Sequence, residues 1–391
     1  MQTFLAIAFV LLLTLFLIWK RHKVQLQKLI FPLFYVVMYR TKFGLRAMNW
    51  IGTRLGMIVR PLSTLGIGIG FAGMGLIIFE LGRTIYMLFT SPVAPAGVGI
   101  VQPFVPNVPG TVFVPFLYFL ASIAIIAILH EAAHGVVARA YNIKIHSSGF
   151  AFMSILVPVI PAAFVEPDEK TMKKRPLKQQ LAVFAAGAVT NIVMAFVVLG
   201  FFALVLEPVV LAVADFEGIR VAGFANVSAA RDAGITEGEL ITHVDGVELH
   251  DLSNYSAFLA PHHPGETIVI TTNVSEYPVV LGTHPENSSK AYLGITPKPE
   301  IGTSPEFSAK YGTLTAEFIL WLIGLFFWLY LLSMGIGLFN LLPLGPVDGG
   351  RMLYALLTTY MPKEKAERIF GWTSTLMLGM ILMTIGGAIF L

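Results

Sequence analysis

The chain has 391 residues, of which 56% are hydrophobic and only 13% are charged. Soluble proteins average about 25% charged residues, so this composition excludes an ordinary soluble domain and indicates a multi-pass protein of the lipid bilayer. The chain has no cysteine, which excludes disulfides and thiolate zinc ligands, and its net charge of +3 comes without the basic, aromatic-interleaved patch that nucleic-acid binding requires.

Six apolar stretches are long enough to predict membrane-spanning helices. They are Thr3–Trp19, Leu62–Leu81, Val112–Ala138, Leu181–Leu206, Ala316–Leu341 and Gly371–Leu391. The first stretch lacks a cleavage site of small residues and is followed by basic residues, so we expect a retained anchor rather than a signal peptide. The sequence therefore predicts a mainly α-helical membrane protein with six transmembrane helices.

Basic residues predict the orientation of these spans. The segments Lys20–Arg60 and Lys170–Arg175 are strongly positive, and positive loops face the cytosol. Six crossings then place both termini and the segment Asp215–Glu306 outside the cytosol. That segment also holds four N-glycosylation motifs, which favours an extracytosolic surface; they begin at Asn226, Asn254, Asn273 and Asn287.

The segment Asp215–Glu306 reads as short strands separated by glycine, asparagine and proline. A short helix is expected to end near Gly234, and a strand to enter a tight turn at Asp245-Gly246. With Gly238 and Gly265, these features resemble a PDZ domain of bacterial membrane and periplasmic proteases. The resemblance implies an α+β domain that captures an extended peptide by strand addition. The alternative is a compact domain that only restricts access to the membrane part.

Two further apolar stretches fit no spanning helix. Leu29–Tyr39 is too short to cross unaided and is expected in or near the interface. Lys144–Pro167 is apolar but contains Gly149, Pro158 and Pro161. Irregular backbone at membrane depth requires contact with protein or a watery cavity, which predicts a re-entrant strand or loop beside an active site. An interfacial loop is the alternative.

A histidine motif ends the third apolar stretch. His130 and His134 are four residues apart, so on a helix they share a face, with Glu131 beside them. Two imidazoles and a carboxylate are suited to bind zinc and to activate a water molecule. Ionisable groups at membrane depth cost about 2.5–3.5 kcal/mol on insertion scales, so such residues are usually functional.

A third zinc ligand is expected from the segment Asn340–Arg351. Asp348 lies in this segment, which closes the fifth predicted span on the side where the histidine helix ends. Prolines and glycines near Asp348 predict a broken helix that admits water. Alternatively, Asp348 only caps the short helix that follows it.

Together these motifs resemble the site-2 protease family of intramembrane zinc metalloproteases, specifically its PDZ-containing prokaryotic or archaeal members. A third match is Ala186–Asn191, which has the family's glycine and asparagine as Gly187 and Asn191. The chain has Ala188 where the family commonly has proline, and Val347 where leucine is usual, but neither departure removes a ligand. The resemblance covers about Phe113–Tyr360.

The resemblance implies a role for each motif residue. It implies one Zn²⁺ ion bound by His130, His134 and Asp348, with Glu131 as general base. It implies that Asn191 and Asn340 bind substrate backbone or the developing oxyanion, although hydrogen bonds between helices are an alternative for both. The implied activity is hydrolysis of peptide bonds in transmembrane helices of membrane proteins, near the cytosolic face.

The expected organisation has four parts. They are an N-terminal membrane extension (1–110), a first catalytic half (111–210), a PDZ-like domain (213–306) and a second catalytic half (312–391). Two other functions remain open. A zinc protease of the prenyl-protein-processing type would use a glutamate as third ligand. A non-catalytic zinc-binding scaffold would not need Glu131 as a base, and few other acids or histidines in the predicted spans could line the pathway of a metal transporter.

Overall fold

The computed structural model describes residues 2–30, 34–90, 100–103, 111–155, 157–285 and 287–390. The chain forms two compact units. Unit 1 comprises residues 1–202 and 324–391, and unit 2 comprises residues 203–323. Residue Leu391 of the last predicted span and residues 31–33 of the predicted interfacial stretch lie outside the described residues.

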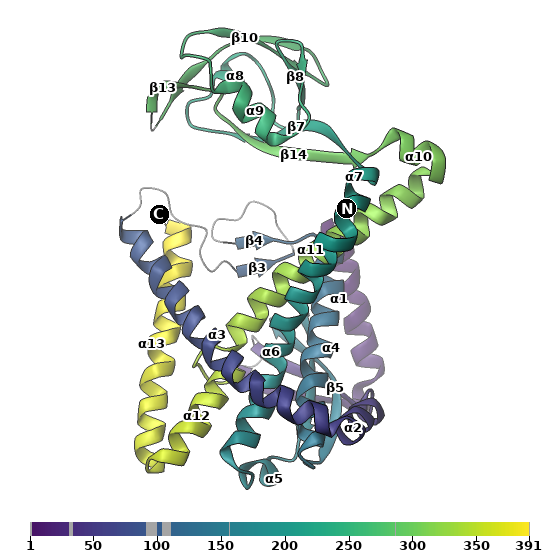
Figure 1. Cartoon of the computed structure of the whole chain (residues 1–391), viewed down its shortest axis with the longest axis vertical. Helices are drawn as coiled ribbons and strands as arrows, with labels where there is room; N and C mark the ends of the chain where they lie inside the picture. The colour runs from purple at the N-terminus through teal and green to yellow at the C-terminus, as the bar shows by residue number, and fades with distance from the viewer. Residues whose placement is uncertain are drawn as a thin grey trace. The chain divides into compact units, whose positions relative to one another are not determined.

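Helices dominate the described part of unit 1 (Figure 1). They are α1 (Gln2–Trp19), α2 (Leu45–Arg54), α3 (Gly56–Thr90), α4 (Phe116–Ala140), α5 (Glu169–Lys173), α6 (Leu177–Phe201), α11 (Thr313–Asn340), α12 (Asp348–Tyr360) and α13 (Lys363–Phe390). A 3-10 turn (Arg21–Lys23) follows α1, and a π-helical turn (Phe202–Leu206) joins α6 to α7 (Glu207–Val213).

Five helical stretches in the described residues are long and apolar enough to cross a membrane. They are Gly56–Thr90, Phe116–Ala140, Leu177–Val213, Thr313–Asn340 and Lys363–Gly387. Each contains or largely overlaps one of the predicted spans. The remaining predicted span, Thr3–Trp19, falls on α1, whose apolar part Phe4–Trp19 is shorter than these five. A sixth crossing therefore stays a prediction.

Helix α6 is the packing centre of unit 1 and contacts α3, α4 and α12. Its alanines Ala182, Ala185, Ala188 and Ala195 are fully buried. Small side chains let helix backbones approach closely, which replaces the hydrophobic driving force that is missing between helices in lipid. One buried cluster joins Leu181 and Ala185 of α6 to Met352 of α12. This close packing fixes the position of every side chain on the inner face of α6.

A four-stranded antiparallel sheet completes unit 1. Its strands are β1 (Val24–Ile30), β2 (Phe34–Thr41), β5 (Ile145–Ile155) and β6 (Val157–Pro167), in the order β1-β2-β5-β6. Leu13 and Leu17 of α1 pack against Val37 of β2 and Phe152 of β5. The stretch Lys144–Pro167 thus forms a hairpin whose edge strand β6 contacts α4. Two short parallel strands, β3 (Ile100–Gln102) and β4 (Thr111–Phe113), precede α4.

Unit 2 is rich in β-structure. Its main sheet has the order β11-β10-β8-β7-β14, with β9 paired to β8, and a separate hairpin pairs β12 with β13. The strands are β7 (Ala214–Phe224), β8 (Leu240–Val244), β9 (Val247–Glu248), β10 (Thr267–Thr272), β11 (Glu276–Val280), β12 (Gly282–His284), β13 (Asn287–Tyr292) and β14 (Ile295–Thr303). Besides α7 and the start of α11, its helices are α8 (Ala229–Asp232), α9 (Leu252–Leu259) and α10 (Pro305–Tyr311).

Local features of unit 2 confirm the turns expected from the sequence. Helix α8 is followed by Gly234 at a φ of 97°, and the β8–β9 turn has Asp245 at 49° and Gly246 at 76°. Positive φ at both central residues is the type I′ geometry that Asp-Gly favours. The sheet encloses an aliphatic core that includes Ile219, Ile241, Ile268 and Ile270. The PDZ-like assignment itself stays a prediction.

Candidate metal centre

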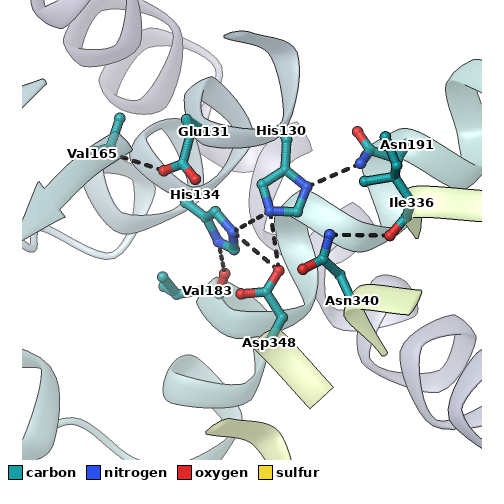
Figure 2. A network of polar contacts seen from close by, with 9 residues as sticks. All are labelled: His130, Glu131, His134, Val165, Val183, Asn191, Ile336, Asn340 and Asp348. Atoms are coloured by element: carbon teal, nitrogen blue, oxygen red, sulfur yellow. Dashed lines mark hydrogen bonds and ion pairs between the residues drawn. The ribbon is translucent and has the colours of Figure 1, made fainter. Parts of the chain in front are cut away.

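The two histidines project from the same face of α4 (Figure 2). His130 and His134 are 9% and 7% exposed, and their Nε2 atoms lie 3.2 Å apart. One helical turn separates the residues, so the helix alone brings the rings together. Two imidazoles with converging nitrogens in a buried site provide two ligands for one metal ion.

Asp348 is the first residue of α12 and reaches the same point. Its Oδ2 atom lies 3.2 Å from His130 Nε2 and 3.2 Å from His134 Nε2. The next two residues must be glycines, because a Cβ on Gly349 would lie 2.1 Å from the Leu341 carbonyl oxygen and one on Gly350 2.2 Å from that of Leu344. Because the two glycines lie so close to these carbonyl groups, the start of α12 packs directly against the preceding turn, and this packing fixes the position of Asp348.

The expectation that Asp348 merely caps α12 is wrong. The N-cap residue is Val347, and this cap has no side-chain hydrogen bond. Asp348 is 5% exposed, and in the described part of the chain its Oδ2 faces the two imidazoles, whose Nε2 atoms lie 3.2 Å away. A buried carboxylate is unfavourable unless a cation neutralises it, and a metal ion bound by the two imidazoles would do so.

The three converging atoms fit a zinc ion. Each pair of atoms among His130 Nε2, His134 Nε2 and Asp348 Oδ2 is 3.2 Å apart. Tetrahedral coordination at about 2.0–2.1 Å separates neighbouring ligand atoms by about 3.3 Å. Two nitrogens and one carboxylate oxygen form a donor set that zinc commonly binds in enzymes, and three protein ligands leave the fourth position open.

Three residues on one face of helix α6 lie against the two histidines. The Val183 carbonyl oxygen lies 2.7 Å from His134 Nδ1, and Asn191 Nδ2 lies 3.1 Å from His130 Nδ1. Between them, a Cβ on Gly187 would lie 2.4 Å from His134 Nε2 and 2.5 Å from His130 Nε2. The three residues are spaced by four and therefore share one face of α6.

Glu131 is held by the neighbouring sheet. The backbone amide of Val165 in β6 donates a hydrogen bond of 2.9 Å to Glu131 Oε2. An edge strand has outward-facing amides, and β6 uses one of them to bind this carboxylate. The same strand is bound to the sheet through Glu166, which accepts hydrogen bonds from Arg40 and Ser147.

Asn340 is the last residue of α11 and lies beside the histidines and Asp348 in Figure 2. Its Nδ2 donates to the Ile336 carbonyl at 3.0 Å, and the side chain is only partly buried. Asn191, by contrast, is fully buried. The two asparagines therefore differ in access, although the motifs suggested the same role for both.

All six site residues expected from the sequence lie in this one region, but two backbone contacts were not anticipated. The spacing of Val183 from Gly187 and Asn191 does indicate a shared helix face. No pattern in the sequence indicates that the Val165 amide meets Glu131, because that contact depends on how β6 pairs and packs.

The chain is similar to several known proteins. An uncharacterized protein of Methanocaldococcus jannaschii, MJ0971, is 24% identical over 319 residues, covering 79% of this chain and 74% of that protein. The PDZ domain of the SdrC-like protein Lmo2051 of Listeria monocytogenes is 20% identical, with a TM-score of 0.19, covering 21% of this chain and 88% of that domain. The model of peptidase family M50 matches residues 118–384, a range that includes every residue of the metal centre. The chain belongs to this family of zinc-dependent membrane metalloproteases, the site-2 protease family.

Proposed function

We propose that this protein is a zinc-dependent intramembrane endopeptidase that hydrolyses peptide bonds in the transmembrane helices of other membrane proteins. One observation carries the proposal. Three ligand atoms from two helices meet at 3.2 Å from one another, directly beside a carboxylate that is not part of the triangle. A structural metal site has no use for such a carboxylate, whereas hydrolysis needs a base.

His130, His134 and Asp348 would hold the ion through Nε2, Nε2 and Oδ2. A bound zinc ion supplies Lewis acidity, which acidifies water and polarises a carbonyl group. The buried ligands keep this part of the site dry, so charges that develop during hydrolysis act at low dielectric.

Glu131 is the proposed general base. Its Oε2 accepts the Val165 amide, so the carboxylate is held at one oxygen while Oε1 is left to accept the proton of the attacking water. The same carboxylate then delivers that proton to the leaving amine nitrogen, which completes the transfer. The hydrogen bond from β6 orients the base without neutralising it.

Asn340 is the proposed substrate-binding amide. A transmembrane helix must unwind before its peptide bond can be attacked, and unwound backbone groups in a dry site need hydrogen-bond partners. Asn340 lies at the end of α11 next to Asp348 and is partly accessible. Asn340 therefore has both an amide group that can hydrogen-bond to unwound backbone and the access that a substrate needs.

The charge pattern and the N-glycosylation motifs support the proposed orientation, and the apolar stretches and motifs support the proposed domain organisation. We propose that the metal centre faces the cytosol, that both termini and the β-rich segment 213–306 lie outside it, and that residues 111–210 and 312–391 form the two catalytic halves. A peptide ligand for segment 213–306 is the corresponding proposal for a PDZ-like domain.

The prenyl-protein-processing alternative predicts a glutamate as third ligand. The described residues bring His130 and His134 together with Asp348 instead. This aspartate and the family match support the intramembrane protease.

The proposal is tested with Glu131→Gln in the purified full-length protein, using a single-span substrate and measuring zinc content alongside. We expect unchanged zinc content and cleavage at least about 100-fold slower, because the base is lost but the ligands remain. Glu80→Gln is the control, since Glu80 pairs with Arg83 on α3, and its cleavage should match the wild type. Full cleavage by a zinc-loaded Glu131→Gln protein would exclude Glu131 as the base.

A further inference from the structure

Asn191 makes an unusual contact for a substrate-binding residue. Its side chain is fully buried on α6, and its amide nitrogen lies 3.1 Å from Nδ1 of His130. Its Oδ1 atom is also buried and has no hydrogen-bond partner within the described part of the chain. A buried acceptor without a donor is unfavourable, so this amide has an unused hydrogen-bonding capacity.

The metal ligands impose a requirement on both imidazoles. A neutral histidine that binds a cation through Nε2 carries its proton on Nδ1, and that N–H needs an acceptor. His134 meets the requirement, since its Nδ1 lies 2.7 Å from the carbonyl oxygen of Val183. His130 also presents Nε2 to Asp348, so its Nδ1 needs an acceptor of the same kind.

Asn191 is the residue beside His130 Nδ1 that has an acceptor to offer. An amide nitrogen at this position would donate to Nδ1, which would force the imidazole proton onto Nε2, where the metal should bind. Rotating the amide by about 180° exchanges Nδ2 and Oδ1 without moving a carbon atom. The rotation gives Nδ1–H its acceptor and moves Nδ2 to the buried position that Oδ1 occupies here, so it is the proton on Nδ1 that favours the rotation.

We propose that in the zinc-loaded protein Asn191 accepts a hydrogen bond from His130 Nδ1–H and so sets the tautomer and ring orientation of this ligand. Asn191 is then a positioning residue for the metal centre, in place of the substrate-binding role expected from the sequence. Val183 and Asn191, eight residues apart on one face of α6, act as a pair of acceptors, one for each histidine. This inference rests on the proposed zinc site.

Access separates this role from substrate binding. Asn191 is 0% exposed, so a substrate carbonyl would have to displace the packing of α6 to reach it. Asn340 is partly exposed and contacts no ligand nitrogen in the described residues. The two side-chain amides therefore have different roles: Asn191 positions a metal ligand, and Asn340 is accessible to the substrate.

The test measures zinc affinity of the full-length protein by competition with a chelator, without any cleavage assay. Asn191→Leu keeps the branched shape of the side chain but has no acceptor, and we expect zinc binding about 10–100-fold weaker than in the wild type. Asn191→Asp keeps only acceptors, and we expect zinc binding at least as tight as in the wild type. Asn340→Leu makes the same chemical change on α11 and should leave zinc affinity unchanged.

Two results would overturn the proposal: wild-type zinc affinity in Asn191→Leu, or a loss in Asn191→Asp as large as in Asn191→Leu. If Asn191→Leu does not fold, ¹⁵N-histidine NMR of the zinc-loaded wild type decides. With asparagine labelled with ¹³C as well, we expect a coupling across the hydrogen bond between His130 Nδ1 and the Asn191 side-chain carbonyl carbon. A protonated Nδ1 without that coupling would reject the assignment, because zinc binding through Nε2 alone places the proton on Nδ1. A different result would show that the proposed zinc site itself is wrong: Asp348→Asn would then bind zinc as tightly as the wild type.

Discussion

At the scale of single residues, the site depends on how closely two helices approach. His130 and His134 on α4 face Val183, Gly187 and Asn191 on α6, and a Cβ on Gly187 would lie within 2.5 Å of both Nε2 atoms. Any side chain there would occupy the space of the ligand nitrogens. The glycine is therefore required by contact, not by backbone conformation.

Gly187→Ala should weaken zinc binding by at least about 10-fold, because the new Cβ would lie within 2.5 Å of both Nε2 atoms and must displace them. Zinc affinity of the purified protein measures the effect. Gly200→Ala is the matched control on the same helix, since its Cβ would meet nothing within 4 Å. Equal zinc affinity in both variants would contradict this prediction, because it would show that the side chains around Gly187 can move to make room for a methyl group.

Most of the site could be predicted at this scale. The spacing of His130 and His134 fixes their relation through helix geometry alone. Asp348 was identified from its place at the end of an apolar span. The contacts of Val183 and Asn191 could not be assigned to particular histidines, because the sequence does not specify the rotation of α6 about its axis.

At the scale of elements, the four-stranded sheet shows what the sequence leaves out. β2 pairs with β5, more than 100 residues away in the chain, through Val37 and Phe152 among others. Neither segment shows the clean alternation of apolar and polar residues that indicates a half-buried strand. Both faces of such a segment can be apolar in a membrane protein, so the period that predicts strands disappears.

The edge strand β6 yields a prediction for Val165. Val165→Pro removes the amide that binds Glu131, and we expect kcat to fall about tenfold with KM and zinc content unchanged, because a hydrogen bond to a charged group is lost. Ala163→Pro is the control. Residues 161, 163 and 165 are spaced by two along β6, so their backbone positions face the same way as the outward-facing Val165 amide. Residue 161 is already a proline, which shows that this edge of the sheet accepts one. An equal loss of kcat in both variants would indicate a general disturbance of β6.

In unit 2, the carboxylate of Glu239 accepts hydrogen bonds from residues of several segments. We therefore predict that the stability of this unit depends on pH. Burial raises the pKa of Glu239, but hydrogen bonds from Thr272, Thr236 and Tyr277 outweigh it and hold the pKa below its ordinary value. The ionised carboxylate therefore stabilises the folded state above the unfolded pKa of about 4.3, and this stability is lost as the pH falls through the lower folded pKa.

Thermal unfolding of the full-length protein measures this effect as the slope of Tm against pH. We expect the Tm of the transition that reports unit 2 to fall as the pH drops below about 4.3, and Glu239→Gln to flatten that slope and lower the Tm at neutral pH. Glu237→Gln is the control, since Glu237 is exposed two residues away. Identical slopes in wild type and Glu239→Gln would refute the stabilising role of this carboxylate.

At the scale of the whole molecule, orientation in the membrane is a proposal that only the charge pattern and the N-glycosylation motifs of the sequence support. The chain has no cysteine, so single cysteines can be introduced at exposed positions without background. Asn226→Cys and Lys173→Cys should react with an impermeant thiol reagent from opposite sides of the membrane. Labelling from the same side would contradict the proposed topology.

The central claim is that His130, His134 and Asp348 form a zinc centre that cuts inside the membrane. The most direct measurement is mass spectrometry of the products made by the purified, zinc-loaded protein from a single-span substrate in lipid. The account predicts a scissile bond within the transmembrane segment, near its cytosolic end, and no products after zinc is removed. Products cut only outside that segment, or cleavage that persists without zinc, would contradict it.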